Sequence, residues 1–222
     1  VNVEGSDLRA LGGSDAVTVN HLAASALRDI HVYLGNDSVA DSVVVNATAF
    51  TDNYTLSASS STATIARNGG VAVTVDEAHL GGGTLTLNLG DGADTVTVQQ
   101  TVAGIITTIN GGNGNDTVRV SPNSNVNGIA GLLVVEGQGG SDSLQVDDTD
   151  NGNHTANITS DRIWGLGMPN STATQRGITY RGVEGLTLRL GTRADTVNVW
   201  STLAGSATTL FTGSGSAQNT VL

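Results

Sequence analysis

Six aspartates recur in one short phrase, in which glycine-rich residues precede Asp and alternating Thr and Val follow it. They are Asp94, Asp116 and Asp142, with Asp15, Asp41 and Asp195 before and after them. Stacked turns of the chain would align these carboxylates in one column, about 5 Å apart. Like charges at that spacing repel unless they are neutralised, and Ca²⁺ prefers carboxylate oxygens as ligands. The phrase therefore predicts a calcium column; the alternative is that each Asp accepts N–H bonds from its own turn and stays solvated.

The densest acidic cluster lies in the segment VDDTDNGN, which contains Asp147, Asp148 and Asp150. It lacks the Gly and terminal Glu of an EF-hand loop, so we interpret it as a solvated loop. No histidine stands in a recognisable phrase with a nucleophilic serine. The chain has no Lys, and its nine Arg residues do not cluster with carboxylates in any motif. We therefore expect no enzyme activity. A carbohydrate-active β-helix enzyme is a third interpretation, with Arg162 and Arg181 as the residues to substitute.

Seven Asn-x-Ser/Thr sequons occur in a chain that is rich in Asn, Ser and Thr. In a secreted protein they are candidate sites for covalent glycans. They begin at Asn36, Asn46, Asn53, Asn115, Asn153, Asn157 and Asn170. Without glycosylation they are ordinary strand and turn residues.

The elements that must position these groups repeat along the chain. The pairs that lie 101 residues apart are Asp15 and Asp116, Asp41 and Asp142, and Asp94 and Asp195. The basic period is about 25 residues, and we interpret the two gaps of 53 residues between phrases as double turns. This predicts a single domain over 1–222, made of two four-turn units at about 1–101 and 102–202 and a partial third at 203–222.

The residues within each period have the chemistry of β-strands. Leu85, Leu87 and Leu89 alternate with Thr86 and Asn88, which is the period of a half-buried strand. One such turn cannot bury its inward Val and Leu residues, whereas coaxial stacking can. We predict an all-β fold, a parallel β-helix solenoid of about 25 residues per turn and about nine turns, right-handed as parallel crossovers are. The segments without an Asp phrase, near 52–75 and 154–180, would be irregular.

One phrase resembles a known repeat. Gly111, Gly112, Gly114, Asp116 and Val118 match the nonapeptide G-G-x-G-x-D-x-U-x of secreted RTX-type proteins. In that family the nonapeptides run in tandem and calcium sits between stacked turns, whereas here one phrase falls in each long period. The arrangement is more similar to the long-period β-helix repeats of very long secreted and cell-surface proteins, including adhesins and appendage components. The resemblance implies a wide solenoid at the cell surface.

The composition excludes several classes of protein. A net charge of −11 opposes binding to nucleic acid, whose phosphates need clustered Lys and Arg. Without Cys, disulfide scaffolds and Cys-based zinc sites are excluded. No apolar run approaches the roughly 20 residues of a membrane-spanning helix. No motif requires a cofactor; Ca²⁺ and covalent glycans are the candidates, and the partners we expect are cations, carbohydrate or protein.

Both ends of the sequence fall inside the repeat. The residues that begin and end it are Val1, Asn2, Val3, Asn219, Thr220, Val221 and Leu222. Open turns expose strand edges that recruit another chain. Either the sequence is a window of a longer array, or copies of the chain stack head to tail. Both predict an extracellular structural protein that builds a filament, flagellar hair or other surface appendage; the alternative is a calcium-dependent stalk or passenger of a secreted adhesin.

Overall fold

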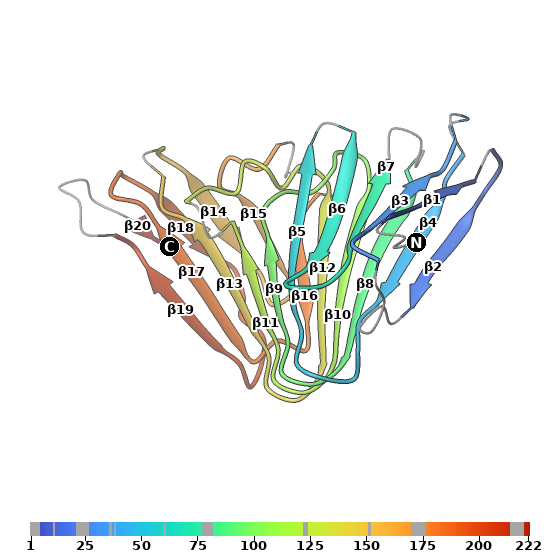
Figure 1. Cartoon of the computed structure of the whole chain (residues 1–222). Coiled ribbons are helices and arrows are strands. Elements are labelled where there is room, and N and C mark those ends of the chain that lie inside the picture. The colour runs from blue at the N-terminus through green and yellow to red at the C-terminus, as the bar shows by residue number, and fades with distance from the viewer. Residues whose placement is uncertain are drawn as a thin grey trace.

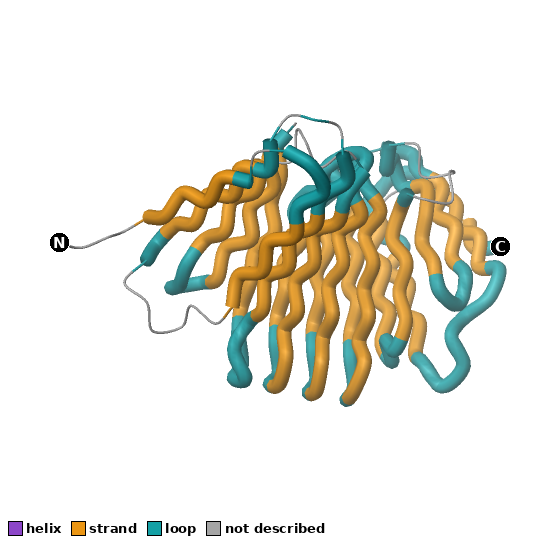
Figure 2. Tube along the Cα trace, turned by 90° about the vertical axis from the view of Figure 1, so that its right-hand side faces the viewer, coloured by secondary structure: helices purple, strands orange, loops and turns teal. Residues whose placement is uncertain are grey.

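The computed structural model describes residues 5–10, 12–20, 27–35, 37, 39–59, 61–76, 82–121, 124–150, 152–169, 176–213 and 220–222. All regular structure in these residues is β-strand, in two ten-stranded sheets that face each other across one core (Figure 1). Figure 2 shows the strands side by side along the long axis of the molecule. The predicted all-β fold is confirmed, and two mostly parallel sheets are consistent with a β-solenoid.

Each sheet is given in its spatial order. Sheet A contains β1 (Gly5–Arg9), β3 (Asp29–Tyr33), β7 (Ala72–Asp76), β6 (Thr62–Arg67), β5 (Asn53–Ser59), β9 (Thr95–Val98), β11 (Thr117–Val120), β13 (Ser143–Asp148), β17 (Gly185–Leu190) and β19 (Ala207–Phe211). Sheet B contains β2 (Ala16–Asn20), β4 (Ser42–Asn46), β8 (Thr84–Asp91), β10 (Ile106–Asn113), β12 (Leu132–Gly139), β16 (Gly177–Arg181), β15 (Arg162–Gly165), β14 (Thr155–Ile158), β18 (Thr196–Val199) and β20 (Thr220–Val221).

The core is a set of aliphatic ladders between the sheets. In β8, Leu85, Leu87 and Leu89 are buried while the residues between them are partly exposed, as the period of two predicts. In the parallel register Leu87 lies beside Ile109, which lies beside Val135 of the next strand. Removing each such side chain from water contributes roughly 1.5–3 kcal/mol. Burial of these ladders therefore favours stacking over any single isolated turn.

Two inserted segments run antiparallel. β5, β6 and β7 form an antiparallel meander inside sheet A, and β14, β15 and β16 form a second one inside sheet B. They occupy the two ranges expected to be irregular. The interpretation of the 53-residue gaps as double turns is wrong, because an inserted meander, rather than a second parallel turn, fills each gap.

The repeat changes sheets from one unit to the next. Within the described residues, each 101-residue unit contributes nine strands, β2–β10 and then β11–β19, and nine is an odd number. Equivalent strands therefore lie in opposite sheets: β2 and β8 are in sheet B, whereas β11 and β17 are in sheet A. A strand returns to its own sheet only after two units, as β1 and β19 do in sheet A.

Glycines allow the backbones of successive turns to touch at the corners before Asp116 and Asp142. Gly114 has a φ of +136°, and a Cβ on it would lie 1.6 Å from the carbonyl oxygen of Gly92 one turn away. Gly140 repeats this arrangement against Gly114, with the same φ and a distance of 1.7 Å. The glycine-rich part of the phrase is therefore required by stacking as well as by backbone conformation.

Candidate functional site

A column of five acidic side chains crosses sheet A at the N-terminal ends of five neighbouring strands. We call Asp52, Asp94, Asp116, Asp142 and Glu184 the acidic column; each precedes a strand, respectively β5, β9, β11, β13 and β17. The backbone N–H of each of the first four donates to a carboxylate oxygen of the next, at N···O distances of 2.6, 2.8, 2.7 and 2.7 Å. The column is therefore continuous over five strands of the sheet.

The central carboxylates of the acidic column are buried. Asp94, Asp116 and Asp142 are 1%, 3% and 4% exposed, and their Oδ2 atoms have no hydrogen-bond partner among the described residues. Burial raises the pKa of Asp94 to about 6 and outweighs the backbone hydrogen bond that lowers it. Burial also raises the pKa of Asp116 and of Asp142, against the same opposing effect. These aspartates are not solvated turn residues.

The predicted single column of six aspartates is only half correct. Asp94, Asp116 and Asp142 do stack, whereas Asp15, Asp41 and Asp195 lie beside sheet B. There the N–H of Asp15 donates to Oδ1 of Asp41 at 2.8 Å, and the N–H of His154 donates to Oδ1 of Asp195 at 2.8 Å. The physical reason is the two meanders. A simple turn adds two strands and returns the phrase to the same sheet, whereas each step that contains a meander, β4 to β9 and β13 to β18, adds five strands and moves the phrase to the other sheet.

Two members of the acidic column escaped the sequence interpretation. Asp52 and Glu184 lack the glycine-rich lead of the phrase, but each is a carboxylate directly before an alternating strand, Asn53-Tyr54-Thr55-Leu56 in one case and Gly185-Leu186-Thr187-Leu188 in the other. Asp52 is also the end of the column that meets a cation: Nε of Arg67 donates to its Oδ1 at 2.6 Å. The sequence signal that identifies both residues is a carboxylate directly before an alternating strand.

A second polar cluster joins three side chains at and just after the end of β13. Asp148 is buried, and its Oδ2 lies 2.7 Å from Nδ1 of His154, which is 3.7 Å from Oδ1 of Asp150. The N–H of Val126 donates to Oδ1 of Asp148 at 3.3 Å. Burial raises the pKa of Asp148 to about 6, although the hydrogen bond and charge of His154 oppose the shift. The interpretation of this segment as a solvated loop is wrong for Asp148, which ties two loops together.

These three side chains are the group among the described residues that could hold a metal ion. One ligand atom from each of Asp148, Asp150 and His154 lies within 4.8 Å of the others. The acidic column offers less, because backbone N–H groups already occupy one oxygen of each carboxylate, and Ca²⁺ needs six to eight oxygens. One backbone N–H thus offsets part of the charge on each central carboxylate of the column, although burial still raises its pKa.

We expect chelation to leave the melting temperature unchanged. A calcium ion at 100 times its Kd would stabilise the fold by about 2.7 kcal/mol, so its removal would lower the melting temperature by roughly 5–10 °C. Thermal unfolding with and without excess EDTA measures this. A drop in melting temperature that Ca²⁺ reverses would contradict the expectation. If Asp148→Asn or Asp116→Asn abolishes that drop, the substituted residue belongs to the group that binds the ion.

No family model, curated protein or solved structure matches this chain. The likeness to RTX-type repeats therefore stays an expectation carried by one phrase. Within the described residues, no helix is long and apolar enough to cross a membrane.

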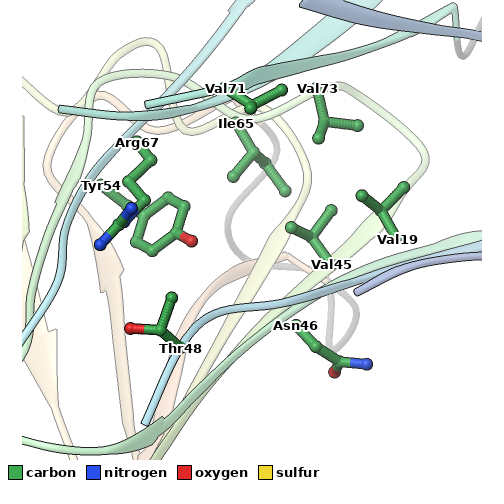
Figure 3. Close-up of a pocket in the computed structure, with 9 residues that line it drawn as sticks. All are labelled: Val19, Val45, Asn46, Thr48, Tyr54, Ile65, Arg67, Val71 and Val73. Carbon is green, nitrogen blue, oxygen red and sulfur yellow. The ribbon is translucent and has the colours of Figure 1, made fainter. Parts of the chain in front are cut away.

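A small pocket lies between the sheets beside the first meander. Figure 3 shows Tyr54 and Arg67 together at one side and the aliphatic side chains of Val45 and Ile65 at the other. Its free volume is about 20 Å³, which suits a single water and not a sugar ring. Burial raises the pKa of the Tyr54 hydroxyl to about 12, with the charge of Asp52 adding to the shift. We interpret the pocket as a packing defect of the core.

The two arginines named for the enzyme interpretation lie on the second meander. Nη2 of Arg162 donates to the carbonyl oxygen of Arg176 at 2.7 Å, and its guanidinium lies over the Trp164 ring, 5.2 Å from the centroid. Arg181 is exposed at the end of β16. Arg162 thus holds the backbone of the inserted segment in place.

The sequons fall into three groups. Asn46 and Asn157 belong to side-chain ladders: Nδ2 of Asn46 donates to Asn20, Oδ1 of Asn46 accepts from Asn88, and Oδ1 of Asn157 accepts from Asn198. The exposed sequon residues are Asn53, Asn115 and Asn153. Asn36 and Asn170 lie outside the described residues. A glycan on Asn46 would break a ladder, so the exposed group contains the better candidates for modification.

The predicted assembly residues are described only in part. Val1, Asn2, Val3 and Asn219 lie outside the described residues. Thr220 and Val221 form β20, which pairs with β18. Val221 and Leu222 are 53% and 71% exposed. The described end of sheet B therefore presents apolar side chains to solvent.

Proposed function

We propose that this chain is a structural β-solenoid segment that builds an extracellular filament or surface appendage by continuing along its axis. The observation that carries the proposal is that, among the described strands, each sheet has an unpaired strand edge at both of its ends. Among the described strands, β1 of sheet A and β2 of sheet B pair on one side only, and β19 of sheet A and β20 of sheet B do the same at the other end. Open edges of this kind template further strands.

Ladders of side chains along the axis support a mechanical role. Asn20, Asn46, Asn88 and Asn110 form a chain of amide hydrogen bonds across four strands of sheet B, with N···O distances of 2.5, 2.7 and 2.7 Å. The acidic column does the same in sheet A. Each ladder adds hydrogen bonds in the direction of the axis, so stiffness comes from repetition and needs no disulfide. A right-handed coil of about 25 residues per turn is part of the proposal.

The alternative function is a cation-dependent stalk of a cell-surface adhesin. It would rest on Asp148, Asp150 and His154, the metal-compatible group described above. The EDTA experiment separates the two: a structural fibre keeps its stability without divalent cations, and a calcium-dependent stalk loses it.

The test of the structural function is electron microscopy of the purified 222-residue chain at rising concentration. We expect rods at low concentration and unbranched fibres at high concentration, with a strand spacing of about 4.8 Å along the axis by fibre diffraction. Dispersed rods at every concentration, with a constant sedimentation coefficient, would contradict assembly by this chain.

A further inference from the structure

We propose that the end formed by β19 and β20 binds the β1–β2 end of a second copy in one defined register, with Leu8 against Leu210 and Arg9 against Phe211. The proposal rests on the proposed function and specifies its interface. Sheet order permits the contact: both ends present a strand of sheet A followed by one of sheet B, so each sheet of one copy continues into the same sheet of the next. With an odd number of units between the ends, sheet A of one copy would meet sheet B of the next.

The register follows from how neighbouring strands pair in sheet A. β1 pairs with β3, and β17 with β19, from the first residue of each strand, so that Gly5 lies beside Asp29 and Gly185 beside Ala207. The same rule sets Gly5 of one copy beside Ala207 of the other. β1 and β19 both have five residues, so the two strands match end to end.

In this register the inward side chains complete the core. Leu8 pairs with buried Val32, and Leu210 pairs with buried Leu188, so both point between the sheets. Leu8 is nevertheless 44% exposed, and Leu210 only partly covered. Stacking would place Leu8 on Leu210 and extend the aliphatic ladder across the junction. A shift of one residue would turn Leu8 outward.

The outward side chains form an alternating column of arginine and aromatic rings. The Arg189 guanidinium lies over the ring of Phe211 at 4.5 Å, and that of Arg9 lies over the ring of Tyr33 at 4.9 Å. Stacking brings Arg9 onto the other face of Phe211, which is 47% exposed. The order becomes Arg189, Phe211, Arg9, Tyr33, and each interior member gains a second cation–π contact.

Sheet B is compatible with the same contact. Val221 pairs with buried Val197, so it points inward, yet it is 53% exposed. Start-to-start pairing of β20 with β2 of the second copy places Val17 on Val221. Both sheets thus continue their inward ladders in the same step.

Cysteine pairs test the register, because the chain has no Cys of its own. Asp7→Cys combined with Thr209→Cys places thiols on exposed, outward positions that face each other across the junction, about 5 Å apart. This spacing lies within the range of a disulfide, so oxidation should give a ladder of covalent multimers. Asp7→Cys combined with Thr187→Cys is the control; its thiols are one strand further apart, about 10 Å, and should not link.

Two phenylalanine variants test the contact. Phe211→Ala should raise the concentration needed for fibre formation about tenfold, since it removes apolar burial and a cation–π contact. Phe50→Ala is the matched control, because Phe50 is 77% exposed on a side turn and should leave assembly unchanged. The register would be overturned if the wild type forms fibres while the first cysteine pair does not cross-link and Phe211→Ala does not change assembly. The structural function would still stand. A wild-type chain that never assembles would overturn both.

Discussion

Gly114→Ala should prevent the solenoid from closing at its centre. The new methyl group would lie 1.6 Å from the carbonyl oxygen of Gly92 and 2.6 Å from its carbon, and both belong to backbone that is fixed by the ladder. The φ of +136° adds strain for any residue with a Cβ. We expect the unfolding free energy to fall by more than about 4 kcal/mol, which is at the extreme for single substitutions. Urea denaturation measures this loss.

Gly13→Ala is the matched control for this variant. Gly13 stands two residues before Asp15, as Gly114 stands two residues before Asp116, and its φ is +102°. A Cβ on Gly13 would meet nothing within 4 Å. Only the conformational cost of roughly 1–2 kcal/mol should remain. Equal losses in the two variants would mean that backbone conformation, and not the contact between stacked turns, requires the glycine.

The protein should become more stable as the pH falls from 7.5 to 5. The pKa of Asp94 is about 6 in the folded chain, above its ordinary value of 3.8, so folding favours the protonated form. Above pH 6 the buried carboxylate is ionised at a cost to the folded state, and that cost decreases as the pH falls from the folded pKa of about 6 toward the ordinary value of 3.8. The raised pKa of Asp148, also about 6, acts in the same direction and window. Thermal unfolding across this range measures the effect.

Asp94→Asn should flatten this pH dependence. The amide keeps an oxygen that can accept the Asp52 N–H, which now lies 2.6 Å from Oδ1, and it carries no charge at any pH. The variant should therefore gain most over the wild type at pH 7.5. Asp29→Asn, at an exposed position of β3, is the control and should keep the wild-type profile. A wild-type melting temperature that falls steadily from pH 7.5 to 5 would contradict the expectation.

The fold class could be predicted because side-chain alternation reports burial directly. Leu85, Leu87 and Leu89 show the period of a strand with one buried face, and the recurring phrase shows that such strands stack. Alternation does not report strand direction, since β5 to β7 alternate whether they run parallel or antiparallel. The meanders, and with them the change of sheet between units, were therefore invisible in the pattern.

The candidate site could be predicted only where it depends on local repetition. Asp94, Asp116 and Asp142 stack because the turns between them are simple. Asp148 lies in the most acidic segment of the chain and is buried all the same, because the N–H of Val126 and the ring of His154 reach it from other loops. Such contacts depend on how loops meet in space, which no spacing in the sequence encodes.

The alternation of the meanders between sheets bears on the shape of a long assembly. In the first unit sheet A gains five strands and sheet B four, and in the second unit these numbers are reversed. One sheet is therefore longer than the other by one strand spacing, about 4.8 Å, in each unit. Meanders that always entered the same sheet would add these differences and curl the rod into an arc. Because they alternate, each unit cancels the bend of the one before it, and the proposed array of paired units would grow straight.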